Sequence, residues 1–223
     1  MAILKHYILY FLRNMKNIYK IFLNHNSNNL YLPNFLIKNV IFINPNLIKY
    51  INSIPMKFYK NTRLIDDFDW DKKNKNINDH ELKDYKFIIC KDFNKQIKLD
   101  NSNSFINQKE NLDKYEIIYN PEINNESLKN YLQNTLNLFN SINKKGLRKL
   151  FDNNIQFMID RNSNLVKINS GDHRFAISRI LNLKRIPIEV KLIHINCIKK
   201  DFDKTKLLSS VNQLIQKIED KYN

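Results

Sequence analysis

The chain has 223 residues and a mass of 26.9 kDa, which suffices for one substantial domain or a domain with a small appendage. Its two glycines and five prolines exclude collagen-like and Gly/Ser-linker architectures, and its two cysteines exclude a disulfide scaffold or a usual four-ligand zinc site. The net charge of +15 is weak evidence for a nucleic-acid partner, because the 37 Asn, 30 Lys and 32 Ile all have A/T-rich codons, so nucleotide bias alone can supply much of the lysine.

Residues 3–23 carry apolar side chains at spacings of three and four, interrupted by Lys and Arg, which predicts an amphipathic helix. Packing onto the body of the protein is the favoured interpretation, and binding to an anionic membrane surface is the alternative. The sequence has no run of 18 apolar residues and no secretory signal. We therefore expect a cytoplasmic protein, with contact to the inner membrane face through residues 1–23 as the alternative.

Residues 35–43 are apolar and β-branched, which predicts a strand, and Asn44-Pro45 predicts a turn followed by a short helix. Apolar periodicity predicts three further helices, and a polar stretch at 101–108 predicts a loop. Gly146 follows one of these helices and is expected to end it. The three predicted helices span residues 81–93, 127–143 and 204–222.

The densest acidic group in the chain surrounds Trp70. In an extended segment, Asp67, Asp69 and Asp71 would share one face, with Trp70 on the other. Because Mg²⁺ prefers carboxylate oxygens, the pattern predicts a metal site at these three residues, with Asp69 and Asp71 also as candidate catalytic acids. The alternative is a solvated acidic loop that Trp70 pins to the protein.

Residues 155–195 predict a strand, a turn, a returning strand, a glycine turn, a helix and a last strand. The three strands are expected at 155–159, 165–168 and 186–193, and the helix at 175–183. A glycine before a helix N-terminus lets backbone N–H groups converge on an anion. The Arg174 guanidinium and the His173 ring would add donors.

The candidate phosphate-binding residues are therefore Ser170, Gly171, Asp172, His173 and Arg174. The alternative is an ordinary strand-to-helix turn in which Asp172 caps the helix.

Four other residues are singled out by type and position. Arg179 and His194 could each contact phosphate or substrate, although a surface or core-edge role is favoured for both. Cys90 and Cys197 are expected to be buried small apolar residues.

Residues 170–174, with Ala176, Leu181 and the run Ile186-Pro187-Ile188-Glu189-Val190, resemble the G-x-[HR]-R…A…L-G…I-P-V signature of the ParB/sulfiredoxin-like superfamily. Asn44-Pro45 with residues 67–71 is similar to a V-x-P…G-D-W-D arrangement in an uncharacterised ParB-like branch that occurs with surface-glycan biosynthesis genes; here Asp67-Phe68 replaces Gly-Asp. The resemblance implies an α+β core, with a small mixed sheet and packed helices, in which residues 171–174 grip nucleotide phosphates.

Two departures limit what the resemblance implies. The sulfiredoxin catalytic cysteine would fall at Asp172, so reduction of sulfinic acids is not expected. Partition ParB proteins carry a DNA-binding helix-turn-helix domain and a dimerisation region after this motif, whereas about 30 residues follow residue 193. The kinase-like members of the superfamily are therefore the nearest enzymatic precedent.

The sequence thus predicts an N-terminal extension at 1–84, a nucleotide-binding core at 85–195 and a C-terminal helix at 196–223. The expected activity is ATP-dependent phosphotransfer to a hydroxyl of a small molecule or glycan precursor, with Mg²⁺ as cofactor. Asp172 or an acid from residues 67–71 would hold the metal or deprotonate the acceptor. A non-catalytic nucleotide-binding switch and a nucleic-acid-binding protein are the alternatives.

Overall fold

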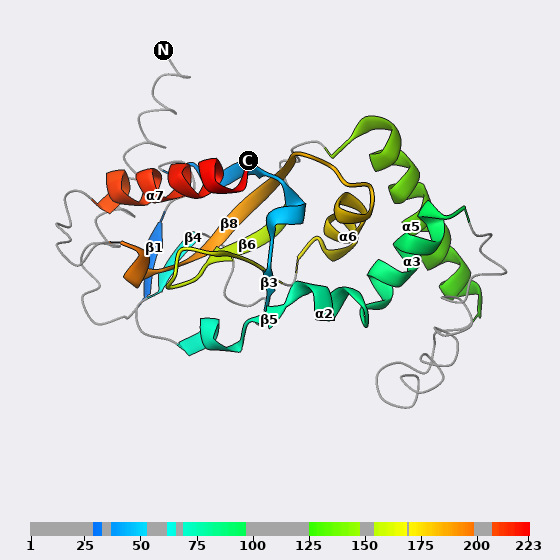
Figure 1. The fold of residues 1–223 in the computed structure, drawn as a ribbon, viewed down its shortest axis with the longest axis horizontal. Coiled ribbons are helices and arrows are strands. Elements are labelled where there is room, and N and C mark those ends of the chain that lie inside the picture. The colour runs from blue at the N-terminus through cyan, green and yellow to red at the C-terminus, as the bar shows by residue number, and fades with distance from the viewer. Residues whose placement is uncertain are drawn as a thin grey trace, which may run out of the picture.

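The protein has an α+β fold, in which helices pack on a mixed eight-stranded sheet (Figure 1). The computed structural model describes residues 29–32, 37–52, 62–65, 69–96, 125–147, 154–168, 170–198 and 207–223.

Strand β8 (Ile186–His194) lies at the centre of the sheet, and eight of its nine residues are buried. Strand β6 (Ile155–Ile159) pairs with it in parallel along one side. Along its length β8 also pairs first with β2 (Val40–Ile43, antiparallel) and then with β4 (Thr62–Ile65, parallel). Six of the nine residues of β8 are apolar, which suits a strand that is covered on both faces.

The remaining strands extend the sheet at its two sides. β1 (Asn29–Leu32) pairs with β4, while β7 (Leu165–Lys167), β3 (Tyr50–Ile51) and β5 (Lys75–Asn76) follow beyond β6. Strands from the first 76 residues therefore share one sheet with the strands from residues 155–194. The boundary expected at residue 85 therefore falls between strands of a single sheet.

Helix α7 (Leu207–Tyr222) packs on β2, and its buried side chains join one core cluster with those of β6 and β8. Helix α6 (Asp172–Ile180) packs against α3 (Tyr85–Asn94) and α5 (Asn125–Lys145), which complete the same cluster. Shorter helical elements are α2 (Ile77–Glu81), η1 (Pro45–Leu47), η3 (Asp69–Lys73) and η5 (Ile195–Cys197).

The structure confirms most of the predicted elements in the described residues. The strands at 155–159, 165–168 and 186–193 are present, as are the helices at 127–143 and 204–222 and the short helix after Asn44. Gly146, with φ +70°, ends α5 by donating its N–H to the Ile142 carbonyl at 2.8 Å. The helix predicted at 3–23 and the loop at 101–108 lie outside the described residues.

The structure differs from three predicted boundaries and from one predicted conformation. The strand expected at 35–43 begins at Val40, and the helix expected at 81–93 is two helices, because the side chain of Asp84 caps a new helix at Tyr85. The helix expected at 175–183 begins at Asp172. Residues 69–73 form a 3₁₀ turn, so the acidic segment is not extended over Asp69 and Asp71.

Among the described helices, none has the length and apolar character needed to cross a membrane.

Gly171 and Gly146 provide a matched pair for a stability test, because both have positive φ but only one is crowded. A Cβ on Gly171 would lie 2.9 Å from the Ile155 Cα, whereas a Cβ on Gly146 would meet nothing within 4 Å. We expect Gly171→Ala to lower the free energy of unfolding by about 2–4 kcal/mol and Gly146→Ala by about 1 kcal/mol. Denaturant unfolding measures both, and equal losses would contradict the packing role of Gly171.

Candidate functional site

The glycine turn is set by the packing of α6 against β6. Gly171 is the N-cap of α6 with φ +75°, and no side chain caps the helix there. Its carbonyl accepts the first intrahelical hydrogen bond, from the Phe175 N–H at 2.9 Å. The N–H groups of residues 172–174 therefore have no acceptor within the helix. Asp172, expected as a cap in the alternative interpretation, is instead the first residue of the helix.

The Asp172 carboxylate joins three elements at the start of α6. One oxygen accepts a hydrogen bond from the Lys167 Nζ of β7 at 2.6 Å, and the other accepts one from the Lys86 Nζ of α3 at 3.0 Å. Burial raises the pKa of this carboxyl, but the two ammonium groups outweigh burial and hold the pKa below its usual value. Both oxygens of the Asp172 carboxylate thus accept hydrogen bonds from ammonium groups, which makes Asp172 a poor general base.

Lys167 is fully buried, at 0% exposure. Its Nζ also donates to the Ile168 carbonyl, and its charge lies over the Phe175 ring, 5.9 Å from the centroid. Burial lowers the pKa of this lysine to about 8 against the opposing attraction of Asp172, and the charges of Lys86 and Arg174 lower it further. The start of α6 therefore has more positive than negative charge close by.

Arg174 lies partly buried in the first turn of α6. One guanidinium nitrogen is 3.3 Å from where a Gly171 Cβ would lie, so the side chain folds back over the glycine turn. Burial lowers the pKa of Arg174, and no residue in the described part of the chain forms an ion pair or hydrogen bond with its guanidinium. With respect to the described residues, the guanidinium is therefore a planar donor that an anion at the turn can use.

His173 faces a row of tyrosine rings. Its Nε2 shares a hydrogen bond with the Tyr131 hydroxyl, and the two ring centroids are 5.5 Å apart. The Tyr131 ring is in turn 6.5 Å from the Tyr85 ring. Burial, and then the charge of Lys86, lower the pKa of His173, which favours the neutral ring. Ser170 forms two backbone hydrogen bonds. Its N–H donates to the Ile168 carbonyl, and its carbonyl accepts from the Gln156 N–H.

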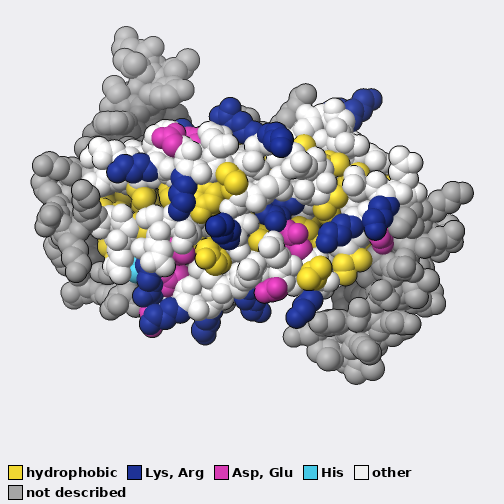
Figure 2. All heavy atoms as spheres, in the orientation of Figure 1, with side chains coloured by type: hydrophobic (Ala, Val, Ile, Leu, Met, Phe, Trp, Pro, Cys, Tyr) yellow, Lys and Arg dark blue, Asp and Glu magenta, His cyan; other side chains and the backbone are white. Residues whose placement is uncertain are grey.

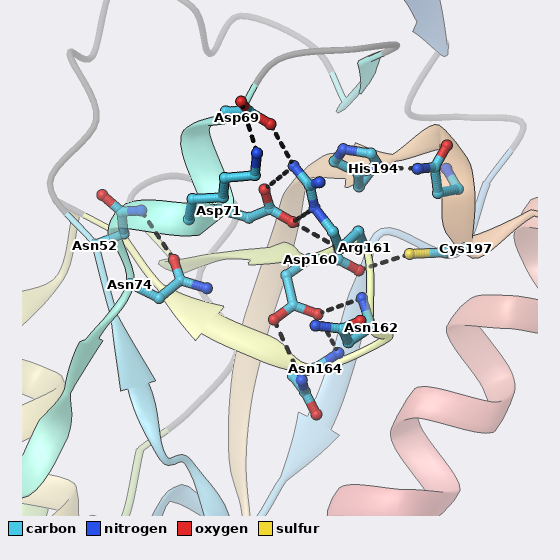
Figure 3. A network of polar contacts seen from close by, with 12 residues as sticks. Asn52, Asp69, Asp71, Asn74, Asp160, Arg161, Asn162, Asn164, His194 and Cys197 are labelled. Carbon is cyan, nitrogen blue, oxygen red and sulfur yellow. Dashed lines mark hydrogen bonds and ion pairs between the residues drawn. The ribbon is translucent and has the colours of Figure 1, made fainter.

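The acidic segment binds an arginine that sequence reasoning missed (Figure 3). Arg161 follows β6, and both oxygens of the buried Asp71 carboxylate accept hydrogen bonds from it, at 2.6–3.0 Å. Asp69 accepts a further bond from Arg161 at 3.0 Å and one from Lys72 at 2.9 Å. The segment is thus pinned by Arg161. Of Trp70 only the backbone is described, and Asp67 lies outside the described residues.

The two predicted site groups lie at opposite ends of β6. Gly171 packs on Ile155 at the start of the strand, whereas Arg161 follows Ile159 at its end. Five residues of strand span about 16 Å. Asp69 and Asp71 therefore do not reach an anion bound at the glycine turn.

The described carboxylates do not fit the expected Mg²⁺. Asp69 and Asp71 are held by cationic side chains, as is Asp172, and within the described ranges no three His, Cys, Asp or Glu residues gather around a common point. We therefore assign no metal ligand among the described residues.

The other candidates occupy structural positions. Arg179 pairs with Glu81 and donates to the Pro45 carbonyl at 2.7 Å, which ties α6 to α2 and η1. His194 is buried beside η5, where its Nδ1 accepts the Asn196 N–H. Cys90 is buried, as expected; Cys197 is partly buried and its thiol donates to the Asp160 carbonyl. Arg179 therefore lies at the edge of the core, where it joins three elements.

Sequence reasoning missed four residues that shape these two sites, namely Lys86, Tyr131, Arg161 and Lys167. One signal was available for Lys167, because it interrupts the apolar run of residues 165–168 in a strand that reads as buried. A lysine in such a strand needs a partner. Nothing in the local sequence distinguishes Lys86 or Arg161 from the many exposed basic residues.

The basic residues do not gather into one stripe on the face shown in Figure 2. Lys and Arg side chains are scattered over it, and Asp and Glu side chains lie between them. A nucleic-acid interface would favour a continuous basic track. This face therefore does not favour the nucleic-acid alternative.

Comparisons with protein-family models, with curated proteins and with solved structures each found no match for this chain. The ParB/sulfiredoxin-like resemblance therefore stays a prediction, and the function has to be inferred from the site.

We expect Asp71→Asn to lower the free energy of unfolding by about 1–3 kcal/mol near pH 7, because the charged hydrogen bonds to Arg161 are lost. Burial raises the pKa of Asp71 but Arg161 lowers it by more, so the ion pair stabilises above the usual carboxyl pKa and fades as pH falls through the lowered value. Denaturant unfolding from pH 7 to 3 should show the two proteins converging. Asp69→Asn is the control, with a smaller loss because that side chain is 66% exposed.

Proposed function

We propose that this protein binds a nucleotide, with its phosphate groups at the start of α6. The N–H groups of residues 172–174 would donate to phosphate oxygens, and the Arg174 guanidinium would pair with them. The observation that carries the proposal is the charge at this turn. Lys86, Lys167 and Arg174 meet there, and among the described residues two carboxylates oppose these three cations: Asp172, which pairs with both lysines, and Asp84, which attracts Lys86.

Both lysines are already engaged by Asp172, so of these three cations Arg174 is the one left for a ligand by the described residues. Its guanidinium lies over the glycine turn, beside the N–H groups that lack acceptors in the helix. A phosphate bound there would offset the excess positive charge and take up these donors together. The ParB/sulfiredoxin-like resemblance assigns the same segment to nucleotide phosphates, which supports a nucleotide over a simple anion.

Binding without turnover is favoured over phosphotransfer. Of the carboxylates expected to act as base or metal ligand, Asp69, Asp71 and Asp172 are described and are held by arginine and lysine, and Asp69 and Asp71 lie at the far end of β6. Phosphotransfer to a hydroxyl of a small molecule or glycan precursor is the enzymatic alternative. It is distinguished by release of ADP from ATP.

The test is calorimetric titration of the wild type and Arg174→Ala with ATP, ADP and CTP, each with and without Mg²⁺. We expect micromolar to millimolar binding, weakened about 10-fold to 100-fold in Arg174→Ala, because a charge-assisted contact is lost. The matched control is Arg185→Ala. Arg185 is exposed, follows the other end of α6 and lies over the Phe42 ring, so its loss should leave affinity unchanged.

Two results would contradict the proposal. One is the absence of binding for all three nucleotides. The other is equal affinity of the wild type and Arg174→Ala, with both proteins folded by circular dichroism. Steady release of ADP would support the phosphotransfer alternative over simple binding.

A further inference from the structure

A pocket of about 580 Å³ lies where α2 meets α3. It is lined by Lys75, Asn76, Asp79, His80, Lys83, Asp84 and Tyr85. A volume of this size is in the range of small-molecule sites. The pocket belongs to neither of the two groups described above, but it shares Tyr85 with the row of rings that ends at His173.

Tyr85 presents an aromatic surface to this pocket. It is the first residue of α3, and its backbone is held by the Asp84 cap, which accepts the Lys86 N–H at 2.7 Å. The residue is 43% exposed, which is unusual for a large aromatic side chain. A ring with a fixed backbone and a solvent-accessible face is suited to stacking with a flat ligand.

Tyr85 also lies close to the proposed phosphate site. The Lys86 Nζ is 5.3 Å from the centroid of the Tyr85 ring and 3.0 Å from an Asp172 oxygen. One ammonium group therefore separates the ring from the first turn of α6. Base and phosphate in a nucleotide are likewise separated by one ribose, so a single ligand can reach both places.

The other residues that line the pocket carry polar or charged groups. The His80 Nε2 and an Asp84 oxygen are 2.9 Å apart, and the His80 ring packs edge-to-face on Phe87 with its centroid at 6.2 Å. These contacts fix the histidine at the pocket wall. Asn76 and Lys83 add further donors and acceptors. One aromatic face with surrounding hydrogen-bonding groups matches the needs of a base with its ribose.

We propose that the α2–α3 pocket binds the nucleoside part of the ligand, with the base stacked on Tyr85. This inference rests on the proposed function, because it places the phosphates at the start of α6. It assigns recognition of the nucleoside to Tyr85 and its pocket, and recognition of the phosphates to Arg174 and the helix N-terminus.

The test compares ATP and CTP with inorganic tripolyphosphate, which has the phosphates but no nucleoside. Calorimetry is performed on the wild type, Tyr85→Ala, Tyr85→Phe and Leu82→Ala. We expect the wild type to bind at least one nucleotide about 10-fold more tightly than tripolyphosphate. Tyr85→Ala should remove this advantage and leave tripolyphosphate binding unchanged, while Tyr85→Phe should keep it because the ring is retained. Leu82 is 72% exposed at the same corner and is the control that should change nothing.

The outcomes separate the inference from the proposed function. If tripolyphosphate binds as tightly as both nucleotides, or if Tyr85→Ala keeps the full advantage, the pocket does not bind the nucleoside, although the phosphate site stands. If neither the nucleotides nor tripolyphosphate binds the wild type, the proposed function fails and this inference fails with it. Loss of the advantage in Tyr85→Phe as well as in Tyr85→Ala would overturn the stacking role.

Discussion

The bridge from Asp172 to two lysines organises the centre of this protein. Lys167 belongs to the sheet, Lys86 to α3 and Asp172 to α6, so one carboxylate fixes the sheet and two helices relative to one another. The position of Lys167 makes this contact obligatory. An ammonium group with no exposed surface is costly unless it is paired, and removal of Asp172 would leave it buried beside two further positive charges.

The same bridge sets the chemistry of the proposed ligand site. Because Asp172 pairs with the two lysines, it does not neutralise Arg174. The N-terminus of α6 therefore keeps its attraction for anions. At the far end of β6, the acidic segment has no such unpaired cation among the described residues of its ion-pair network. There Arg161 pairs with both Asp69 and Asp71, so these three charges are paired with one another and stabilise the fold.

The elements of residues 155–194 could be predicted from the sequence because their signals are local. Apolar runs, the Asp160 turn and a rare glycine each act within a few residues, and the strands and α6 formed close to the expected places. The partners of the charged groups could not be predicted. Lys86 and Asp172 are 86 residues apart in the chain, and Asp71 and Arg161 are 90 residues apart. In a chain with 30 lysines, composition gives no means of choosing between them.

The way in which β8 is paired affects how the chain can be divided. Its two successive partners on one side, β2 and β4, both come from the segment before residue 85. A fragment confined to residues 85–195 would expose that side of β8 as a row of unpaired N–H and C=O groups on a mostly apolar, buried strand. Such an edge is a template for pairing with other chains, so the segment expected to be an accessory extension protects the central strand from self-association.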